Sequence, residues 1–238
     1  MKFFDQLQIS TEAERQHLLT LPLIHRSIKG EVNLELYVAF LCQAYHHVKH
    51  TVPLLMAAGA RVPTDREWLR TAFAEYIEEE LGHQEWILND IAACGYNRDA
   101  ASQSQPNMAT EVMIAYAYDA VQRVNPLTMF GMVQVLEGTS ILKASAAADG
   151  IQNALKLPDD AFTYLRSHGA LDLEHMKFFE RLMNRIDAPE EQEMIKHYAN
   201  VFYRLYGDVL RSVAPEQATP LENSSSKAKE TSRAVHAA

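Results

Sequence analysis

The segment SHGALDLEHM, residues 167–176, places two histidines and one aspartate at helical spacing. His168, Asp172 and His175 lie at i, i+4 and i+7, so their side chains share one face if the segment is an α-helix. The surrounding positions are apolar, with Leu165, Leu171, Met176, Phe178, Phe179 and Leu182. A polar stripe on an otherwise apolar helix indicates a hydrogen-bonded network, a solvated face or a metal site. Motifs elsewhere in the sequence are needed to choose between these interpretations.

The same helical period runs through nearly the whole chain and predicts an all-α fold. Helices are expected over residues 11–20, 33–59, 64–94, 107–124, 127–155, 158–186 and 188–213. No segment of strand length alternates between apolar and polar residues, so β structure is not expected. Because most of these segments are longer than an average helix, the sequence predicts a single-domain bundle of about seven long helices.

Several residues mark where these helices should begin and end. Thr11, with Glu14 three residues later, predicts a capping box. Asn33 is expected to cap the second helix, and Pro53 is expected to kink it. Gly95 is expected to end the third helix, because glycine readily adopts the left-handed conformation found at helix ends.

Length and composition predict one packed domain followed by a tail. The chain has 238 residues, of which 47% are hydrophobic, enough for a sizeable core. We assign residues 1–213 to this domain. Residues 214–238 are rich in Ser, Ala, Lys and Glu without apolar periodicity, which predicts a disordered C-terminal tail.

Charge and cysteine usage narrow the class of protein. The net charge of −9 argues against nucleic-acid binding, which needs clustered lysines and arginines. No apolar run is long enough to cross a membrane, and the opening MKFFDQLQIS is too polar for a signal peptide. Cys42 and Cys94 form no CxxC pair and indicate no disulfide framework. These features predict a cytoplasmic protein.

A second acid–histidine pair lies in YIEEELGHQEW, residues 76–86. Glu80 and His83 are three residues apart, and Glu79 is four residues from the same histidine, so either carboxylate can share a helical face with the imidazole. The Glu-x-x-His spacing is how helical di-iron carboxylate proteins present one carboxylate and one imidazole to their metals. The spacing therefore predicts metal ligands here.

Glu137 stands alone in the apolar stretch GMVQVLEGTSIL, residues 131–142. A buried carboxylate is costly unless a cation, a proton or several hydrogen-bond donors compensate it. A cation is the interpretation that agrees with the other two motifs, whereas a tyrosine or lysine partner is the alternative.

Together the three motifs supply three carboxylates and three imidazoles from three helices: Glu80, His83, Glu137, His168, Asp172 and His175. This mixture suits iron or manganese, and the lack of thiolates argues against structural zinc. Six ligands are too many for one ion that keeps an open position, so a pair of ions fits better. The spacing predicts Glu80, Glu137 and His168 on one ion, and His83, Asp172 and His175 on the other.

The order of these residues resembles the haem-oxygenase-like di-iron oxidases, a branch of the superfamily that includes thiaminase II (TenA-like) and PQQ-synthase-like proteins. Members of that branch have a Glu and a His on one helix, a Glu on a later helix, and then a His-xxx-Asp-xx-His motif. The resemblance extends over residues 20–210. Some members add a seventh ligand from the preceding long helix, where His47 of YHHVKH is the best-placed residue. A partly exposed polar face is the alternative for that segment.

The resemblance implies a haem-oxygenase-like bundle that binds two iron ions, with manganese as the alternative metal, and that uses O2 as co-substrate. It also implies a small amino-acid-like or fatty-acid-like substrate and an external electron donor. A homodimer is expected, as the commonest symmetric assembly. Tyr76, Phe130, Met176 and Phe179 are expected to line a cavity beside the metals.

Other functions remain open on the sequence alone. A TenA-like aminopyrimidine hydrolase shares the fold and needs a cysteine nucleophile, for which Cys42 and Cys94 are the candidates. A haem oxygenase would use His25 as the proximal ligand and would leave the ligand set on the three helices unexplained. A non-enzymatic helical scaffold or binding protein would contain the polar triplet as a buried hydrogen-bond network. Iron content distinguishes these alternatives from a di-iron oxidase.

Overall fold

The computed structural model describes the backbone of residues 1–213 and the side chains of that range except 168–174. Every regular element in this range is helical, and no β-strand occurs in it, so the all-α prediction is confirmed. The tail predicted for residues 214–238 lies outside the described residues. None of the described helices combines the length and apolar composition that a membrane span requires.

The described chain forms α-helices with short helical turns between some of them. The α-helices are α1 Phe3–Ser10, α2 Glu12–Leu19, α3 Pro22–Ile28, α4 Leu34–Val48, α5 Thr51–Ala60, α6 Glu67–Glu80, α7 His83–Ala93, α8 Arg98–Gln103, α9 Met108–Asp119, α10 Met129–Leu155, α11 Thr163–Met183 and α12 Pro189–Ser212. The helices predicted over 127–155 and 188–213 match α10 and α12 closely, whereas α11 is shorter at both ends than the predicted 158–186. The short helices α1, α3 and α8 were not predicted, because so few turns give little periodic signal.

The prediction of about seven helices is too low because two long segments are broken. Residues 33–59 form α4 and α5, which separate at Lys49 and His50. Pro53 has no N–H to donate to the Lys49 carbonyl, so the chain begins a new helix instead of kinking one. Residues 64–94 form α6 and α7, which separate at Leu81 and Gly82, where Gly82 has a φ of 90°.

Two of the predicted helix-end signals are confirmed and one is wrong. The Asn33 side chain accepts a hydrogen bond from the Leu36 amide at 3.0 Å, as expected of an N-cap. Gly95 has a φ of 84° just after α7 ends at Ala93. Thr11 forms no capping box, because its hydroxyl donates to the Leu7 carbonyl at 2.8 Å across the junction between α1 and α2.

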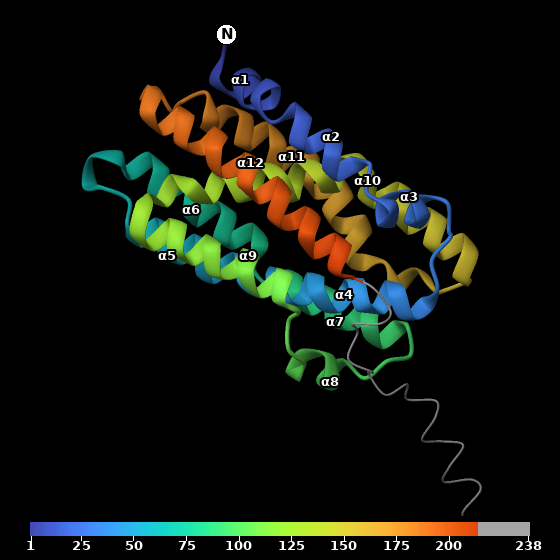
Figure 1. The fold of residues 1–238 in the computed structure, drawn as a ribbon. Helices are drawn as coiled ribbons and strands as arrows, with labels where there is room; N and C mark the ends of the chain where they lie inside the picture. The colour runs from blue at the N-terminus through green and yellow to red at the C-terminus, as the bar shows by residue number, and fades with distance from the viewer. Residues whose placement is uncertain (214–238) are drawn as a thin grey trace, which may run out of the picture.

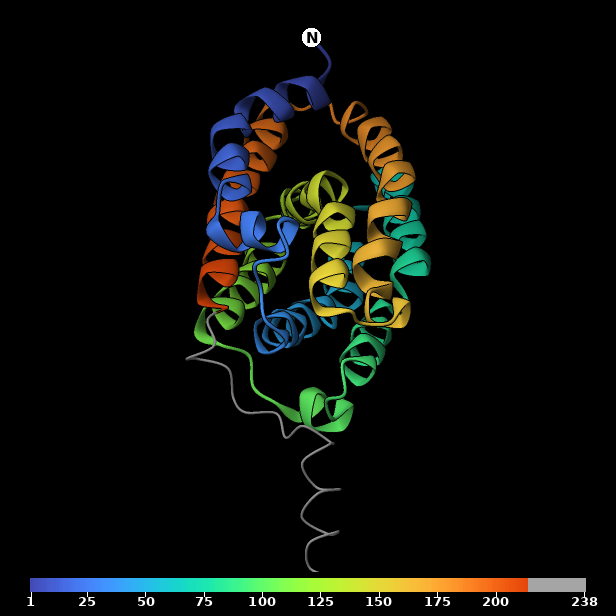
Figure 2. The same ribbon diagram turned by 90° about the vertical axis from the view of Figure 1, so that its right-hand side faces the viewer.

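Helix α10 runs through the middle of the bundle (Figure 1). Figure 2 shows α11 on one side of it and α12 on the other, and both make extensive contacts with it. Two glycines allow this close packing. A Cβ at Gly131 would lie 2.7 Å from the Ala199 nitrogen of α12, and one at Gly150 would clash with the Ile28 carbonyl of α3. Glycine is therefore required where neighbouring helices approach α10 most closely.

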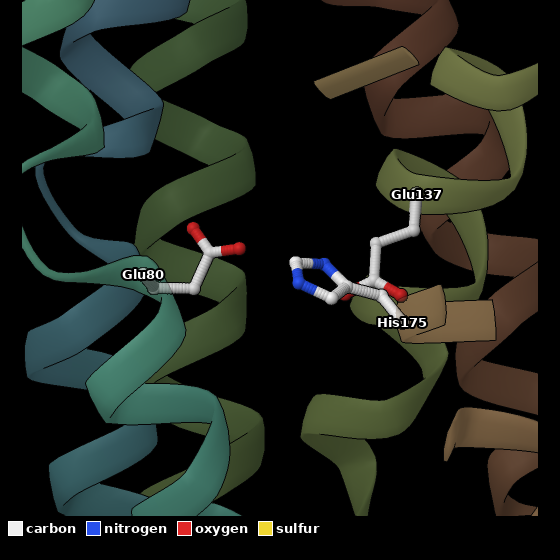
Figure 3. Close-up of side chains that lie close together, drawn as sticks. All are labelled: Glu80, Glu137 and His175. Carbon is white, nitrogen blue, oxygen red and sulfur yellow. The ribbon is translucent and has the colours of Figure 1, made fainter. Parts of the chain in front are cut away.

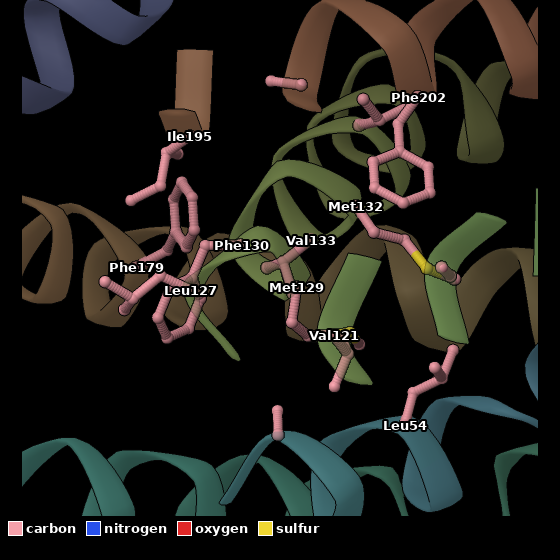
Figure 4. Packing of buried hydrophobic residues seen from close by; sticks show 14 of the residues in the cluster. Leu54, Val121, Leu127, Met129, Phe130, Met132, Val133, Phe179, Ile195 and Phe202 are labelled. Carbon is pink, nitrogen blue, oxygen red and sulfur yellow. The ribbon is translucent and has the colours of Figure 1, made fainter. Parts of the chain in front are cut away.

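Aliphatic and aromatic side chains together form the main core, where Phe130, Phe179 and Phe202 lie among Leu, Ile, Val and Met residues (Figure 4). Phe130 stacks on Phe73 with ring centroids 5.1 Å apart and meets the edge of Phe179 at 6.2 Å. All three rings are fully buried. Burying one such side chain stabilises a fold by about 1.5–3 kcal/mol, so this cluster holds α6, α10 and α11 together.

Candidate metal centre

The break between α6 and α7 brings a carboxylate and an imidazole together. Glu80 is the last residue of α6 and His83 is the first residue of α7. Nδ1 of His83 lies 3.1 Å from Oε2 of Glu80, and the imidazole stacks on Trp86 with centroids 4.1 Å apart. The expectation that both residues share one continuous helix is wrong, because Gly82 turns the chain between them. Their predicted proximity is nevertheless what the structure shows.

Glu137 and His175 reach the same region from α10 and α11. Nδ1 of His175 lies 3.9 Å from Oε1 of Glu137, and both residues are buried. Nε2 of His175 lies 3.3 Å from Oε2 of Glu79, whose side chain is 45% exposed. Of the two candidate carboxylates on α6, Glu80 is therefore the buried one and Glu79 is the one open to solvent.

Glu80, Glu137 and His175 form one buried group, shown in Figure 3. One ligand atom from each residue lies within 4.8 Å of the ligand atoms of the other two. Their exposed fractions are 9%, 8% and 5%. Two carboxylates that converge away from water repel each other and favour a bound cation. The donor set of carboxylate oxygens and imidazole nitrogen suits iron or manganese, so these residues fit the expected metal.

The other two predicted ligands lie on α11. This helix is continuous over Thr163–Met183, so His168, Asp172 and His175 keep the helical spacing that the sequence predicted. The side chains of His168 and Asp172 lie outside the described residues. The spacing predicts Glu137 and His175 on different ions, whereas the structure places their ligand atoms in one group.

His47 is the histidine of YHHVKH that lines the cavity beside this centre. It is buried, it lines the same cavity as Glu80 and Glu137, and its ring meets the edge of Tyr206 at 5.9 Å. His46 is also buried and shares a 2.8 Å hydrogen bond with the Ser104 hydroxyl. Burial lowers the pKa of His46 to about 4. The alternative of a partly exposed polar face is wrong for both residues, and His47 remains a candidate seventh ligand.

A cavity of about 140 Å³ adjoins the buried group. Its walls are mostly apolar and come from α3, α4, α10, α12 and the start of α11; they include Leu23, Leu36, Phe40, Met132, Leu136 and Leu210. The expectation that Tyr76, Phe130, Met176 and Phe179 line this cavity is wrong. These side chains pack into or against the main core instead.

One residue that helps to position the site, and that the sequence analysis missed, is Asp90 of α7. It is fully buried and accepts hydrogen bonds from the Tyr164 amide at 2.9 Å and from the amide and hydroxyl of Thr163. It thereby caps the start of α11 and connects the helix that carries His83 to the helix that carries His175. Burial raises the pKa of Asp90 to about 6, against the effect of these donors. A lone acid in the apolar stretch ILNDIAA was the available signal, the same kind that identified Glu137.

The residues required by the alternative functions are poorly placed. Burial raises the pKa of both Cys42 and Cys94 to about 12, which keeps the thiols protonated and weakly nucleophilic. Neither cysteine lines the cavity. His25 of α3 is exposed and does not line the cavity either, although its neighbour Ile24 does.

Solved structures with the same fold come from several bacteria. A domain of unknown function with a haem-oxygenase-like fold from Shewanella denitrificans is 23% identical, with a TM-score of 0.79, and the match covers 88% of this chain and 91% of that one. A TenA homologue from Pseudomonas syringae is 11% identical, with a TM-score of 0.74, over 89% of this chain and 92% of that one. Haem oxygenase-1 from Synechocystis, solved with haem, is 13% identical, with a TM-score of 0.71, over 91% and 94%.

These likenesses establish the haem-oxygenase-like fold. No curated protein matches the chain. The family described as "Iron-containing redox enzyme" matches residues 38–207, a range that includes Glu80, Glu137 and His175. The chain belongs to this family of iron-containing redox enzymes.

Proposed function

We propose that the protein is a non-haem di-iron oxidase that uses O2 to oxidise a small organic substrate. The observation that carries this proposal is the buried group of Glu80, Glu137 and His175, which gathers ligand atoms from three helices beside a cavity. Such a group is costly in a purely structural role, because buried like charges destabilise a fold without a cation. The matching family supports iron as that cation.

The proposed ligands are those expected from the sequence: Glu80, His83, Glu137, His168, Asp172 and His175. Three protein ligands for each of two ions leave positions open for O2 and for bridging groups. When bound, the iron pair would supply the electron-transfer and O2 chemistry that amino-acid side chains lack. Manganese remains the alternative metal, since it accepts the same donors.

The chain's own residues provide the environment for this chemistry. The hydrogen bonds of Asp90 hold the start of α11, and Gly82 turns the chain so that Glu80 and His83 meet. The apolar walls of the cavity exclude water and would hold the substrate next to the buried carboxylates. Rigid placement on helices is what a metal centre needs, because small displacements of ligands weaken binding.

The alternative of a TenA-like hydrolase has less support. That activity needs a reactive thiol in the central pocket. Burial keeps the thiols of Cys42 and Cys94 protonated, and neither residue lines this cavity. A haem enzyme that uses His25 as proximal ligand has little support as well, because that residue is exposed. A metal-free scaffold would gain nothing from the converging carboxylates.

An external electron donor and a homodimer belong to the same proposal. An iron pair bound here would need electrons from outside the chain to react with O2 repeatedly. The dimer rests on the prevalence of symmetric pairs among oligomers. Light scattering of the purified chain tests it, and a monomer would contradict it.

Anaerobic titration of the metal-free protein with Fe(II) tests the proposed function. We expect two equivalents of iron to bind per chain, followed by rapid O2 consumption when air is admitted. A chain that binds no iron, or that binds iron without consuming O2, would contradict the proposal. Haem binding in place of iron would favour the haem enzyme instead.

A further inference from the structure

Lys143 of α10 lines the cavity at a distance from the buried carboxylates. It is the one lysine or arginine among the described residues that line this cavity. It follows Glu137 by six residues, which corresponds to about 9 Å along the helix axis. No hydrogen bond or ion pair joins the Lys143 ammonium to any other described residue. The half-buried cation is therefore available to a ligand inside the cavity.

Two hydroxyl groups beside Lys143 also lack partners. Thr139 Oγ1 and Ser140 Oγ are buried and have no hydrogen-bond partner among the described residues, and both residues line the cavity. They precede Lys143 by four and three residues, so all three are neighbours on one side of α10. Thr139 as a whole is only 8% exposed. A buried hydroxyl without a partner is costly, which indicates that a ligand supplies the missing hydrogen bonds.

We propose that Lys143, Thr139 and Ser140 bind the carboxylate of an apolar carboxylic acid, which is the substrate of this centre. A carboxylate accepts hydrogen bonds from an ammonium and from two hydroxyl groups at once. The apolar walls of the cavity take the hydrocarbon body of the same molecule. The inference rests on the proposed function, in that the molecule held in this cavity is the one that is oxidised.

The charged residues that line the cavity favour a ligand with one negative charge. One lysine neutralises one carboxylate, whereas Glu80 and Glu137 in the same cavity would repel a second negative charge. A dianion such as an alkyl phosphate therefore binds more weakly. Lys143 lies about 9 Å from Glu137 along the axis of α10, so the proposal places the acid group at Lys143 and not at the metal ligands. In this orientation the hydrocarbon part of the substrate extends along the apolar wall towards Glu80 and Glu137.

Calorimetry on the full-length, metal-free protein tests this inference with octanoate as the probe. Without iron, the carboxylate cannot bind as a metal ligand, so any preference for it reports the lysine site. We expect octanoate to bind at least about tenfold more tightly than 1-octanol and octyl phosphate, and octylamine to bind more weakly still. Equal binding of octanoate and 1-octanol, or no octanoate binding at about 5 mM, a concentration at which even weak specific complexes form, would overturn the inference.

Variants separate the anion site from general packing. Lys143→Met keeps the apolar stem and should lower octanoate affinity about tenfold without changing 1-octanol binding, and Lys143→Arg should retain the affinity. Thr139→Val should lower octanoate affinity about threefold without lowering the melting temperature, because the hydroxyl has no hydrogen-bond partner in the part of the chain that the structure describes. Lys29→Met, an exposed position outside the cavity, is the matched control for net charge.

The outcomes distinguish this inference from the proposed function. Unchanged octanoate affinity in Lys143→Met would overturn the lysine site while leaving iron binding untouched. Failure to bind iron, with octanoate selectivity intact, would overturn the oxidase and leave a carboxylate-binding protein.

Discussion

Glu80 and His83 contact each other across a helix break, with Oε2 of the glutamate 3.1 Å from Nδ1 of the histidine. Gly82 makes this contact possible, because its φ of 90° lies in a region that residues with a Cβ rarely adopt. The carboxylate then ends α6 and the imidazole begins α7. The candidate metal centre therefore depends on a turn as well as on helix faces.

Replacing Gly82 with alanine should weaken both the fold and the centre. Alanine at this backbone conformation costs about 1–2 kcal/mol of unfolding free energy, although no atom crowds its Cβ. Urea denaturation measures the loss, and iron titration should show weaker binding. Gly59→Ala is the control: Gly59 lies inside α5 and its added Cβ would only touch Phe73 at 3.5 Å. That variant should be slightly more stable than the wild type, and equal effects of the two substitutions would contradict the role of the turn.

Glu137→Gln should lower the iron content while leaving the metal-free protein at least as stable as the wild type. The amide keeps the shape of the side chain but removes a ligand charge, and it relieves the repulsion between Glu137 and Glu80. Iron analysis and melting temperatures of both forms measure the two effects. Glu79→Gln, at an exposed position, should retain the iron of the wild type. The choice of Glu80 over Glu79 as ligand would be wrong if Glu79→Gln lost iron and Glu80→Gln kept it.

Asp90 should make the stability of the metal-free protein depend on pH. Burial raises its pKa in the folded protein to about 6, above the unfolded value of about 3.9, so the folded state binds more protons between these pH values. Stability therefore rises as pH falls from 7 to 5. Asp90→Asn cannot bind this proton. The free energy of unfolding of the wild type should therefore rise relative to that of the variant as the pH falls from 7 to 5. Urea midpoints at the two pH values measure the difference, and a constant difference would show that Asp90 does not titrate there.

Phe130→Ala should destabilise the fold without removing the metal ligands. The ring is fully buried against Phe73 and Phe179 in the main core, and truncation of such a residue costs about 3–5 kcal/mol. Since Phe130 does not line the cavity, the iron stoichiometry of the folded variant should equal that of the wild type. Guanidinium denaturation and iron analysis of one sample test both statements. A change in stoichiometry with unchanged stability would mean that Phe130 belongs to the metal site.

Helical periodicity was sufficient to predict the fold class and the long helices α10, α11 and α12. It overestimated helix length at two places where backbone chemistry breaks the pattern. Pro53 removes one N–H, and Gly82 permits a left-handed turn, and neither interrupts the spacing of apolar residues in the sequence. The spacing of apolar residues therefore continues through positions at which the helix itself is broken.

The candidate site was predictable where a polar residue stands in an apolar segment. Glu137 and His175 were identified in this way, and both are buried in one group with Glu80. Asp90 shows the same signal but serves as a cap, which only the contact with Thr163 and Tyr164 reveals. The wall of the cavity was not predictable, because a residue near a ligand in sequence can face the core instead. Phe179, four residues after His175, packs against Phe130.

Mössbauer and electron paramagnetic resonance spectroscopy on the iron-loaded protein, after exposure to O2, test the proposed di-iron centre most directly. Two ferric ions held at the usual di-metal separation of about 3.5–4 Å would be magnetically coupled. We expect two irons per chain, no paramagnetic resonance signal from isolated ferric iron, and a diamagnetic Mössbauer spectrum. A single uncoupled ferric ion per chain, with a strong paramagnetic resonance signal, would contradict a di-iron centre at Glu80, Glu137 and His175.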